Sequence, residues 1–341
     1  MRNKTNINKK VFLAESLEEL HLCQCRVSPV ESVRFKCLRK LTVEQVQVDD
    51  RTFETIMLGC PLLRSLVLKS CWELRNFRLS EAASPRLKHF VLCHTKRIEG
   101  RSIEIDVLNI ETVNIAGPWI WSHRQSTLLF SPLTSLRLYD VIMSSKSFDW
   151  LSFSCPALVS LALQYCSGFE EFHLESNSVK YLHIWTKEIL LKRITICVPN
   201  IVKFNFNADI LQVPDTFSFT TTTSKEWSSK VFLYSSREED PDFDVTSWFP
   251  KLRRLLKALS GSQIYLSLQM NGDPQNVPCS AVVSNELPVV VWILDFTTYK
   301  CRTVSWYSGF TNVLFRVCQP SHIWGCSLVN KSTNNYKLSE F

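Results

Sequence analysis

Apolar residues recur along this chain in a short frame, apolar-x-x-apolar-x-apolar. The segment LRSLVL (63–68) shows the frame well, with Leu63, Leu66 and Leu68 at its apolar positions. Further copies begin at residues 17, 38, 87, 110, 133, 158, 179 and 201, so that neighbouring copies start 21–25 residues apart. Residues two apart point to the same face of an extended strand. The pattern therefore predicts nine short strands, each with one buried and one exposed face.

The period of the frame predicts how these strands assemble. A repeat of roughly 20–29 residues with this frame is typical of leucine-rich repeats. One strand cannot bury its apolar face alone, whereas stacked parallel strands share a continuous core. We expect an α/β fold, a solenoid of about nine repeats with a parallel concave sheet and a convex side that mixes helical and extended segments. The helical segments are expected at 53–61 and 148–156, and the extended ones at 74–79, 102–108 and 169–174.

The pattern changes after about residue 210. A Thr- and Ser-rich stretch and an acidic stretch follow without helical periodicity, and both are typical of loops. Beyond them, one amphipathic helix and two strand-like runs predict a small α+β unit that caps the last repeat. The expected organisation is an N-terminal tail (1–16), a leucine-rich-repeat domain (17–210), a linker (211–247), the α+β capping unit (248–320) and a C-terminal tail (321–341).

Charge and targeting signals narrow the classes of partner. The 39 Lys and Arg residues exceed the 32 Asp and Glu residues and give a net charge of +7. They are scattered, so we expect no nucleic-acid partner. The N-terminus lacks the apolar core of a signal peptide, and the longest apolar run, 287–294, is shorter than half a membrane span. We therefore expect no membrane partner and a cytoplasmic and/or nuclear protein, whose 13 cysteines stay reduced.

The repeat frame also assigns places to several cysteines. Cys25, Cys71 and Cys166 each lie eight residues after the start of a frame, where the leucine-rich consensus turns a small Asn or Cys side chain inward. Cys60 and Cys155 precede a proline at the end of a convex segment. We interpret these thiols as small buried apolar groups. The alternative is a zinc site at HLCQC (21–25), but a closed zinc site needs four convergent ligands and the frame separates these side chains.

Motifs for catalysis are missing from the sequence. The chain has eight glycines, and no two lie close enough to form the G-x-G-x-x-G loop or a P-loop. HExxH and GxSxG do not occur either. We therefore expect no enzyme, and no catalytic, cofactor-binding or metal-binding residues.

The exposed face of the predicted sheet is the remaining candidate for function. Its first repeats carry small polar side chains, whereas the later repeats add aromatic residues and an arginine, which are typical anchors of protein interfaces. Two further tryptophans follow in AGPWIWSHR, although they could instead pack beneath their own loop. The candidate protein-binding residues are Arg137, Tyr139, Tyr181, His183, Trp185, Trp119 and Trp121.

Two stretches carry a resemblance to a known family. GCPLLRSLVLKSCWELRNFRLSEAASPRLKHFVL (59–92) resembles the repeats of plant F-box/leucine-rich-repeat proteins, in which a convex segment ending in Cys-Pro precedes a strand and an S-P-x-L segment leads to the next strand. FSCPALVSLALQYCSGFEEFHLESNSVKYLHI (153–184) repeats this layout. LDFTTYKCRTVSWYSGFTNVLF (294–315) is more weakly similar to the FBD region that ends such proteins.

The resemblance implies a function. In this family an F-box binds the Skp-type adaptor of a cullin ubiquitin ligase, and the repeats bind the target protein that is ubiquitinated. The expected role is therefore a protein-interaction module that binds a target on the concave face. No F-box motif is present in the sequence, so the Skp-type adaptor and the cullin ligase are expected partners only if the full-length protein has an F-box. The alternatives are an F-box-less or truncated relative that acts as a non-catalytic scaffold or decoy and, less favoured, a metal-binding or enzymatic protein.

Overall fold

The repeated frame forms parallel strands. The computed structural model describes residues 5–94, 100–121, 130–143, 154–186, 191–222, 226–235, 245–270, 286–298 and 304–328. The chain divides into two compact units. Unit 1 comprises residues 1–183 and 197–200, and unit 2 comprises 184–196 and 201–341.

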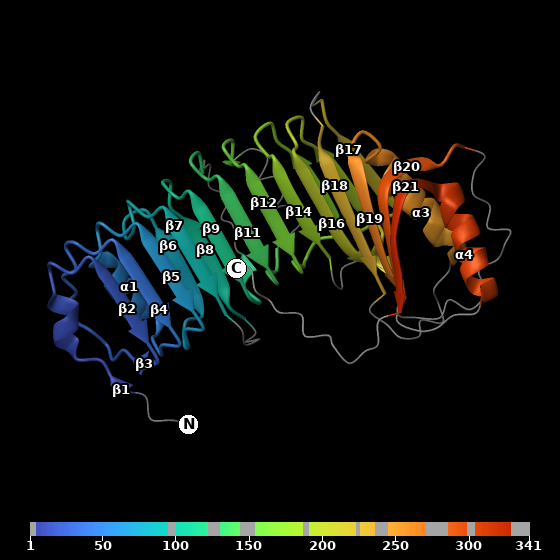
Figure 1. Cartoon of the computed structure of the whole chain (residues 1–341). Helices are drawn as coiled ribbons and strands as arrows, with labels where there is room; N and C mark the ends of the chain where they lie inside the picture. The colour runs from blue at the N-terminus through green and yellow to red at the C-terminus, as the bar shows by residue number, and fades with distance from the viewer. Residues whose placement is uncertain are drawn as a thin grey trace. The chain divides into compact units, whose positions relative to one another are not determined.

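Unit 1 is built on one parallel sheet (Figure 1). Every frame from residue 17 to residue 179 coincides with one of its strands, and these follow one another in chain order across the sheet. They are β2 (Glu19–Cys23), β4 (Lys40–Glu44), β5 (Ser65–Lys69), β7 (His89–Cys93), β9 (Thr112–Ala116), β11 (Ser135–Tyr139), β12 (Ser160–Gln164) and β14 (Tyr181–Trp185), the last two residues of β14 belonging to unit 2. The predicted leucine-rich-repeat solenoid is confirmed.

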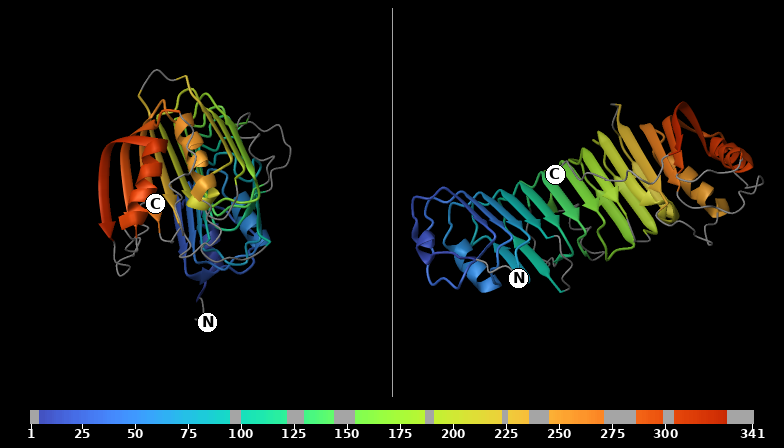
Figure 2. Two further views of the ribbon diagram at one scale, coloured as in Figure 1. Left: turned by 90° about the vertical axis from the view of Figure 1, so that its right-hand side faces the viewer. Right: turned by 60° about the horizontal axis from the view of Figure 1, so that its bottom comes forward.

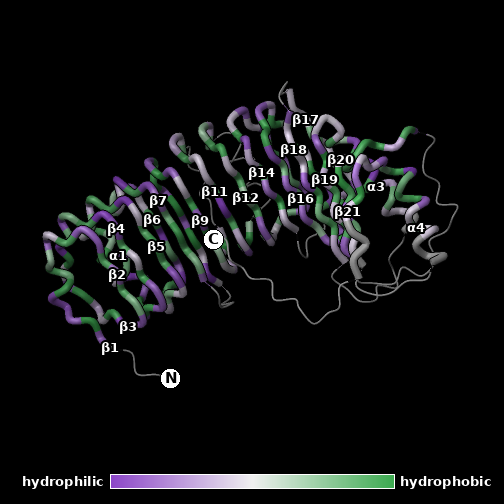
Figure 3. Tube along the Cα trace, in the orientation of Figure 1, coloured by the Kyte–Doolittle hydropathy of each residue, from purple (hydrophilic) through white to green (hydrophobic). Residues whose placement is uncertain are grey.

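Alternation along each strand separates the core from solvent. Equivalent frame residues lie side by side, as Leu41 does with Leu66 and Leu66 with Phe90. All three side chains are fully buried. The residues between them alternate toward solvent, and Figure 3 shows the matching alternation of hydropathy along the strands. The continuous core predicted from the two-residue period is therefore present.

The return segments of unit 1 mix a helix with short strands, as predicted. Helix α1 (Asp50–Leu58) begins after Asp49, whose carboxylate accepts a hydrogen bond from the Thr52 amide at 2.7 Å. A second parallel sheet has the order β10-β8-β6. The extended segments are β1 (Thr5–Asn6), β3 (Cys25–Arg26), β6 (Asn76–Ser80), β8 (Ser102–Asp106), β10 (Ile120–Trp121) and β13 (Glu171–Glu175), and a 3-10 turn, η1, covers Lys9–Leu13. The predicted helical segment 148–156 falls largely outside the described residues.

Aromatic side chains join the two layers of unit 1. The Phe77 ring of β6 lies 5.4 Å from the Phe53 ring of α1. It also stacks on the Phe90 ring of β7 at 5.4 Å, with the planes 6° apart. Each of these rings is at most 3% exposed. The core of unit 1 thus lies between its main sheet and the return segments.

A second set of parallel strands forms unit 2. Its order is β16-β18-β19-β20-β21, and all the pairs are parallel. The strands are β16 (Lys203–Asp209), β18 (Ser228–Tyr234), β19 (Gln263–Met270), β20 (Val289–Thr298) and β21 (Cys318–Leu328), and the other elements are β15 (Arg193–Cys197, whose Cys197 belongs to unit 1), η2 (Ile210–Gln212), β17 (Thr216–Thr220), α3 (Val245–Ala258) and α4 (Val304–Val317).

This arrangement differs from the sequence prediction in two respects. The segment 211–247, expected to be a linker, contains β17 and β18. The segment 248–320, expected to be an α+β unit, holds parallel strands, with α3 between β18 and β19 along the chain and α4 between β20 and β21, which is an α/β arrangement. The first eight residues of the expected C-terminal tail, 321–328, belong to β21, and its remainder lies outside the described residues.

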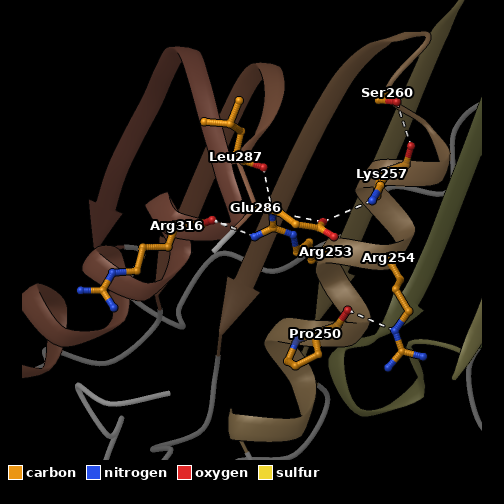
Figure 4. Close-up of polar contacts among 8 residues, drawn as sticks. All are labelled: Pro250, Arg253, Arg254, Lys257, Ser260, Glu286, Leu287 and Arg316. Carbon is orange, nitrogen blue, oxygen red and sulfur yellow. Dashed lines mark hydrogen bonds and ion pairs between the residues drawn. The ribbon is translucent and has the colours of Figure 1, made fainter. Parts of the chain in front are cut away.

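Helices α3 and α4 cover one face of the last strands of unit 2 (Figure 2). The Phe310 ring of α4 lies 5.5 Å from the Phe249 ring of α3 and stacks 5.4 Å from the Phe296 ring of β20. Arg253, on α3, adds a polar junction (Figure 4). Its guanidinium donates to the Leu287 carbonyl at 2.7 Å and to the Arg316 carbonyl at 3.3 Å.

Among the described residues, no helix is both long and apolar enough to cross a membrane.

Candidate protein-interaction surface

The solvent-exposed side of the main sheet in unit 1 is the face predicted to be concave, and we call it the open face. It consists of the first, third and fifth residues of strands β2, β4, β5, β7, β9, β11 and β12, together with the first and third residues of β14, which are the two that lie in unit 1. The second and fourth residues of β4 to β14 are buried, while the open-face residues of those strands are exposed or half-buried. The open face therefore presents a regular array of side chains, three to a strand except on β14, which has two.

Lysine, histidine and glutamate side chains at the β2 end of the open face lie in pairs. The Lys40 ammonium lies 3.6 Å from the Glu19 carboxylate, and His21 Nε2 lies 3.8 Å from the Glu44 carboxylate. Exposed pairs of this kind contribute only about 0–1 kcal/mol to stability. The pair of Lys40 and Glu19 adds no net charge to this end of the face.

The middle of the open face is lined by short side chains. Val67 of β5 lies beside Val91 of β7, which lies beside Asn114 of β9. Ser135 of β11 lies beside Ser160 of β12. These residues hold no formal charge and project little, so the sheet itself is accessible here to a partner's backbone and side chains.

Arg137 rises from this lining of short side chains. It is exposed, and its neighbours on the adjacent strands are Asn114 and Ala162. No Asp or Glu of the described chain lies within ion-pair distance of its guanidinium. An exposed guanidinium without a counter-ion, flanked by small residues, is available to bind a carboxylate from outside.

Aromatic side chains lie on β11 itself and on β14, which is separated from β11 by β12. The Tyr139 ring packs edge-on against Tyr165 at 5.1 Å and 89°. Burial, followed by the charge of Asp140, raises the pKa of Tyr139, so its hydroxyl stays protonated and able to donate. On β14, Tyr181 is 47% exposed, whereas His183 and Trp185 are half-buried on the same face of the strand.

Tyr165 is a member of this group that the sequence reasoning missed. It follows strand β12 with a left-handed backbone, at φ 54°. Gln24, Gln45, Ser70 and Asp140 occupy the same place after their strands, with φ between 51° and 57°. The sequence does hold a signal for this position, because each of these residues lies seven positions after the start of its frame.

Trp119 and Trp121 do not belong to the open face. They are only 1% and 7% exposed. Trp121 lies on β10, in the three-stranded sheet of the return segments, and the Arg101 guanidinium carbon lies 5.3 Å from the Trp119 ring centroid. These two candidates are therefore corrected. Both indoles pack inward, as the alternative interpretation held, because alternation turns both toward the core.

The cysteines take the structural places that the frame predicted. Cys71 Sγ donates to the Val43 carbonyl at 3.4 Å, and Cys166 Sγ donates to the Leu138 carbonyl at 3.5 Å. Each thiol thereby connects the end of one strand to the strand of the preceding repeat. Burial raises the pKa of Cys60, Cys155 and Cys166 to about 12, so these thiols carry no thiolate near neutral pH.

Metal ligands do not converge in the part of the chain that the structure describes. No group of three or more His, Cys, Asp or Glu side chains is arranged there to hold an ion. In HLCQC, His21 and Cys23 lie on the open face, while Cys25 turns inward and is 9% exposed. The geometry of this segment thus separates the three side chains, as the frame predicted.

Comparison with known proteins identifies relatives of the repeat region. The family model described as "FBD-associated F-box protein At5g56370, LRR repeats" matches residues 1–127 and 104–201. In Arabidopsis thaliana, the putative FBD-associated F-box protein At1g78730 is 23% identical over 186 residues, which cover 51% of this chain and 42% of that protein. The F-box/LRR-repeat protein At3g03360 is 25% identical over 193 residues, which cover 53% of this chain and 38% of that protein. The chain thus spans less than half the length of these two relatives. No solved structure matches the chain.

Proposed function

Because the chain belongs to the leucine-rich-repeat family of FBD-associated F-box proteins, we propose that it binds a target protein on the open face of unit 1. The binding is non-covalent and requires no catalysis. The role is that of the substrate-recognition part of an SCF-type ubiquitin ligase. We place the protein in the cytoplasm and/or the nucleus, where such ligases meet their targets.

The observation that carries this proposal is the environment of Arg137. This residue is exposed between Asn114 and Ala162 and has no acidic partner in the described chain. Arg, Tyr and Trp are the residue types that most often dominate the binding energy of protein interfaces. We therefore expect the target to supply an Asp or Glu carboxylate for Arg137.

The aromatic neighbours supply the apolar part of the interface. Tyr139 and Tyr165 hold each other edge-on. The Tyr181 amide donates to the Val159 carbonyl at 3.0 Å, which joins the start of β14 to the residue before β12, and the Tyr181 side chain is exposed. An acidic side chain next to an apolar one on the target matches this combination of guanidinium and phenol rings.

A second candidate role separates target binding from ubiquitination. Since the alignments cover less than half of the relatives, an F-box in the full-length protein would add the Skp-type adaptor and the cullin ligase as partners. Without an F-box, the same open face would make the protein a scaffold or decoy that holds a target away from the ligase.

Affinity capture from plant cells tests both roles. The intact chain serves as bait beside Arg137→Ala and Tyr181→Ala in one variant. Arg51→Ala on α1 is the matched control, because Arg51 is an exposed arginine outside the open face. A target should be retained by the wild type and the control and lost from the double variant. The two roles are then separated with the full-length protein as bait: the ligase role predicts that it captures a Skp-type protein together with the target, and the scaffold or decoy role predicts that it captures the target alone.

A further inference from the structure

A second group of polar and aromatic residues lies on the strands of unit 2. It consists of Lys230, Tyr265, Ser267, Asp295 and Trp324, and we call it the Asp295 cluster. Lys230 of β18 lies beside Tyr265 of β19, and Asp295 of β20 lies beside Trp324 of β21. Four successive parallel strands therefore bring these residues together, although the sequence spreads them over 95 positions.

Contacts within the cluster fix the orientation of the Asp295 carboxylate. The Tyr265 hydroxyl donates to Asp295 Oδ2 at 3.3 Å, and the Ser267 hydroxyl donates to the same oxygen at 3.1 Å. Burial, followed by the negative charge of Asp295, raises the pKa of Tyr265, so its hydroxyl stays a donor. A carboxylate held by two donors is preorganised for a further partner at its other oxygen.

The rings of the cluster are also held in place. The Lys230 ammonium lies 4.9 Å from the Tyr265 ring centroid, a cation–π contact. The Trp324 indole packs at right angles to the Tyr265 ring, with the centroids 6.4 Å apart. Ile293, the strand neighbour of Tyr265, is only 5% exposed. The rings are thus set in a packed surface.

Two features of the cluster indicate that it binds a partner. Asp295 has no Lys, Arg or His within ion-pair distance in the described chain, since Lys230 lies over Tyr265 instead. Trp324 is 57% exposed, although it belongs to the residue type most enriched at interface hot spots. A fixed carboxylate without a cation and an exposed indole therefore lie together on one surface.

We propose that the Asp295 cluster binds an arginine side chain of a partner protein. The planar guanidinium stacks on the Trp324 indole and donates to the free oxygen of Asp295. Arginine suits this site better than lysine because its flat, delocalised cation both stacks on aromatic rings and forms directed hydrogen bonds to a carboxylate. The cluster consists of unit 2 residues only, and the proposal does not depend on the proposed function.

Peptide selection on the intact chain tests the proposal. Random dodecapeptides displayed on phage are selected on the wild type, and those that still bind Trp324→Ala are discarded. We expect the remaining peptides to share an arginine. In synthetic copies, replacing this arginine by citrulline, its neutral isostere, should weaken binding about five- to tenfold, as expected for the loss of one cation–π and ion-pair contact.

Two variants of the protein make the result specific. Asp295→Asn keeps an oxygen that accepts hydrogen bonds from the two hydroxyl groups but removes the charge. It should weaken the binding of the arginine peptides by the same factor. Trp72→Ala, at a 39% exposed tryptophan of unit 1, should leave binding unchanged. The proposal would be contradicted if the selected peptides were acidic, or if the citrulline peptides bound as tightly as the arginine peptides. It would also be contradicted if no peptide were recovered whose binding depends on Trp324. None of these outcomes bears on the Arg137 surface.

Discussion

At the scale of single residues, the repeats depend on backbone conformations that few residue types adopt. Gly168 has φ 93°, and a Cβ placed on it would overlap the Met143 carbonyl oxygen. Gly100 has φ 77°, but nothing lies within 4 Å of the place a Cβ would take. Both glycines have left-handed backbones, and only Gly168 also lies against another segment.

This difference predicts unequal costs for two alanine substitutions. Gly100→Ala should lower the free energy of unfolding by about 1 kcal/mol, the cost of a left-handed backbone for alanine. Gly168→Ala should lower it by about 3 kcal/mol or more, because the clash adds to the strain. Urea unfolding monitored by circular dichroism measures both. Equal losses would mean that the close approach to Met143 is absent in solution.

Burial of the thiols predicts their reactivity. The pKa of Cys60, Cys155 and Cys166 is raised to about 12, so each thiol stays protonated as the pH rises through 8 and forms thiolate only near pH 12. Cys23 and Cys37 are exposed. Iodoacetamide at pH 8 should therefore modify the exposed pair on the folded chain and spare the buried three. Mass spectrometry of the peptides gives the extent, and modification of Cys166 at the rate of Cys23 would refute the assigned burial.

At the scale of elements, the alternation of apolar residues predicted the strands of the nine frames but not strand β18. The register pairs Ser229 with Phe204, so a serine occupies an apolar position of the frame. The structure accommodates this serine because its hydroxyl lies 2.6 Å from that of Ser262. The hydrophobic pattern could not predict this contact, because Ser262 lies 33 residues away from Ser229. Trp119 and Trp121 show a related limit, since the sequence left open whether they are exposed or pack beneath their own loop.

The junction of α3 and α4 gives an element-scale prediction. Arg253 is buried and binds the Leu287 and Arg316 carbonyls, whereas Arg254 is exposed and donates to the Pro250 carbonyl at 3.4 Å. Arg253→Ala leaves those carbonyls without their donor, so it should lower the free energy of unfolding by about 2–4 kcal/mol. Arg254→Ala should cost less than about 1 kcal/mol.

Hydrogen exchange locates the effect of these two changes. Amides of α3 and α4 should exchange faster in Arg253→Ala than in the wild type, because the junction joins α3 to α4 and to the segment that precedes β20. Exchange in unit 1 should stay the same. If Arg254→Ala loosened the helices equally, the buried guanidinium would not be the residue that joins them.

At the scale of the whole molecule, the features that repeat along the chain could be predicted from the sequence better than those that occur once. Nine copies of one frame made the solenoid predictable, because an error at one repeat leaves the others intact. The binding surface was less predictable. The frame placed Arg137, Tyr139 and Tyr181 on the open face. The lack of an acidic partner for Arg137 among the described residues, and the small residues on either side of it, depend on the register of three strands. The Asp295 cluster, assembled from four strands with long connections, has no signature in the chain.

Above all, we propose that the open face of unit 1 binds a target protein through Arg137 and its aromatic neighbours. The most direct test is isothermal titration calorimetry of the captured target against the intact chain and its single variants. Arg137→Ala should weaken binding at least about tenfold, corresponding to about 1.4 kcal/mol, while Arg51→Ala should leave the dissociation constant unchanged. Equal affinity of Arg137→Ala and the wild type would contradict the claim.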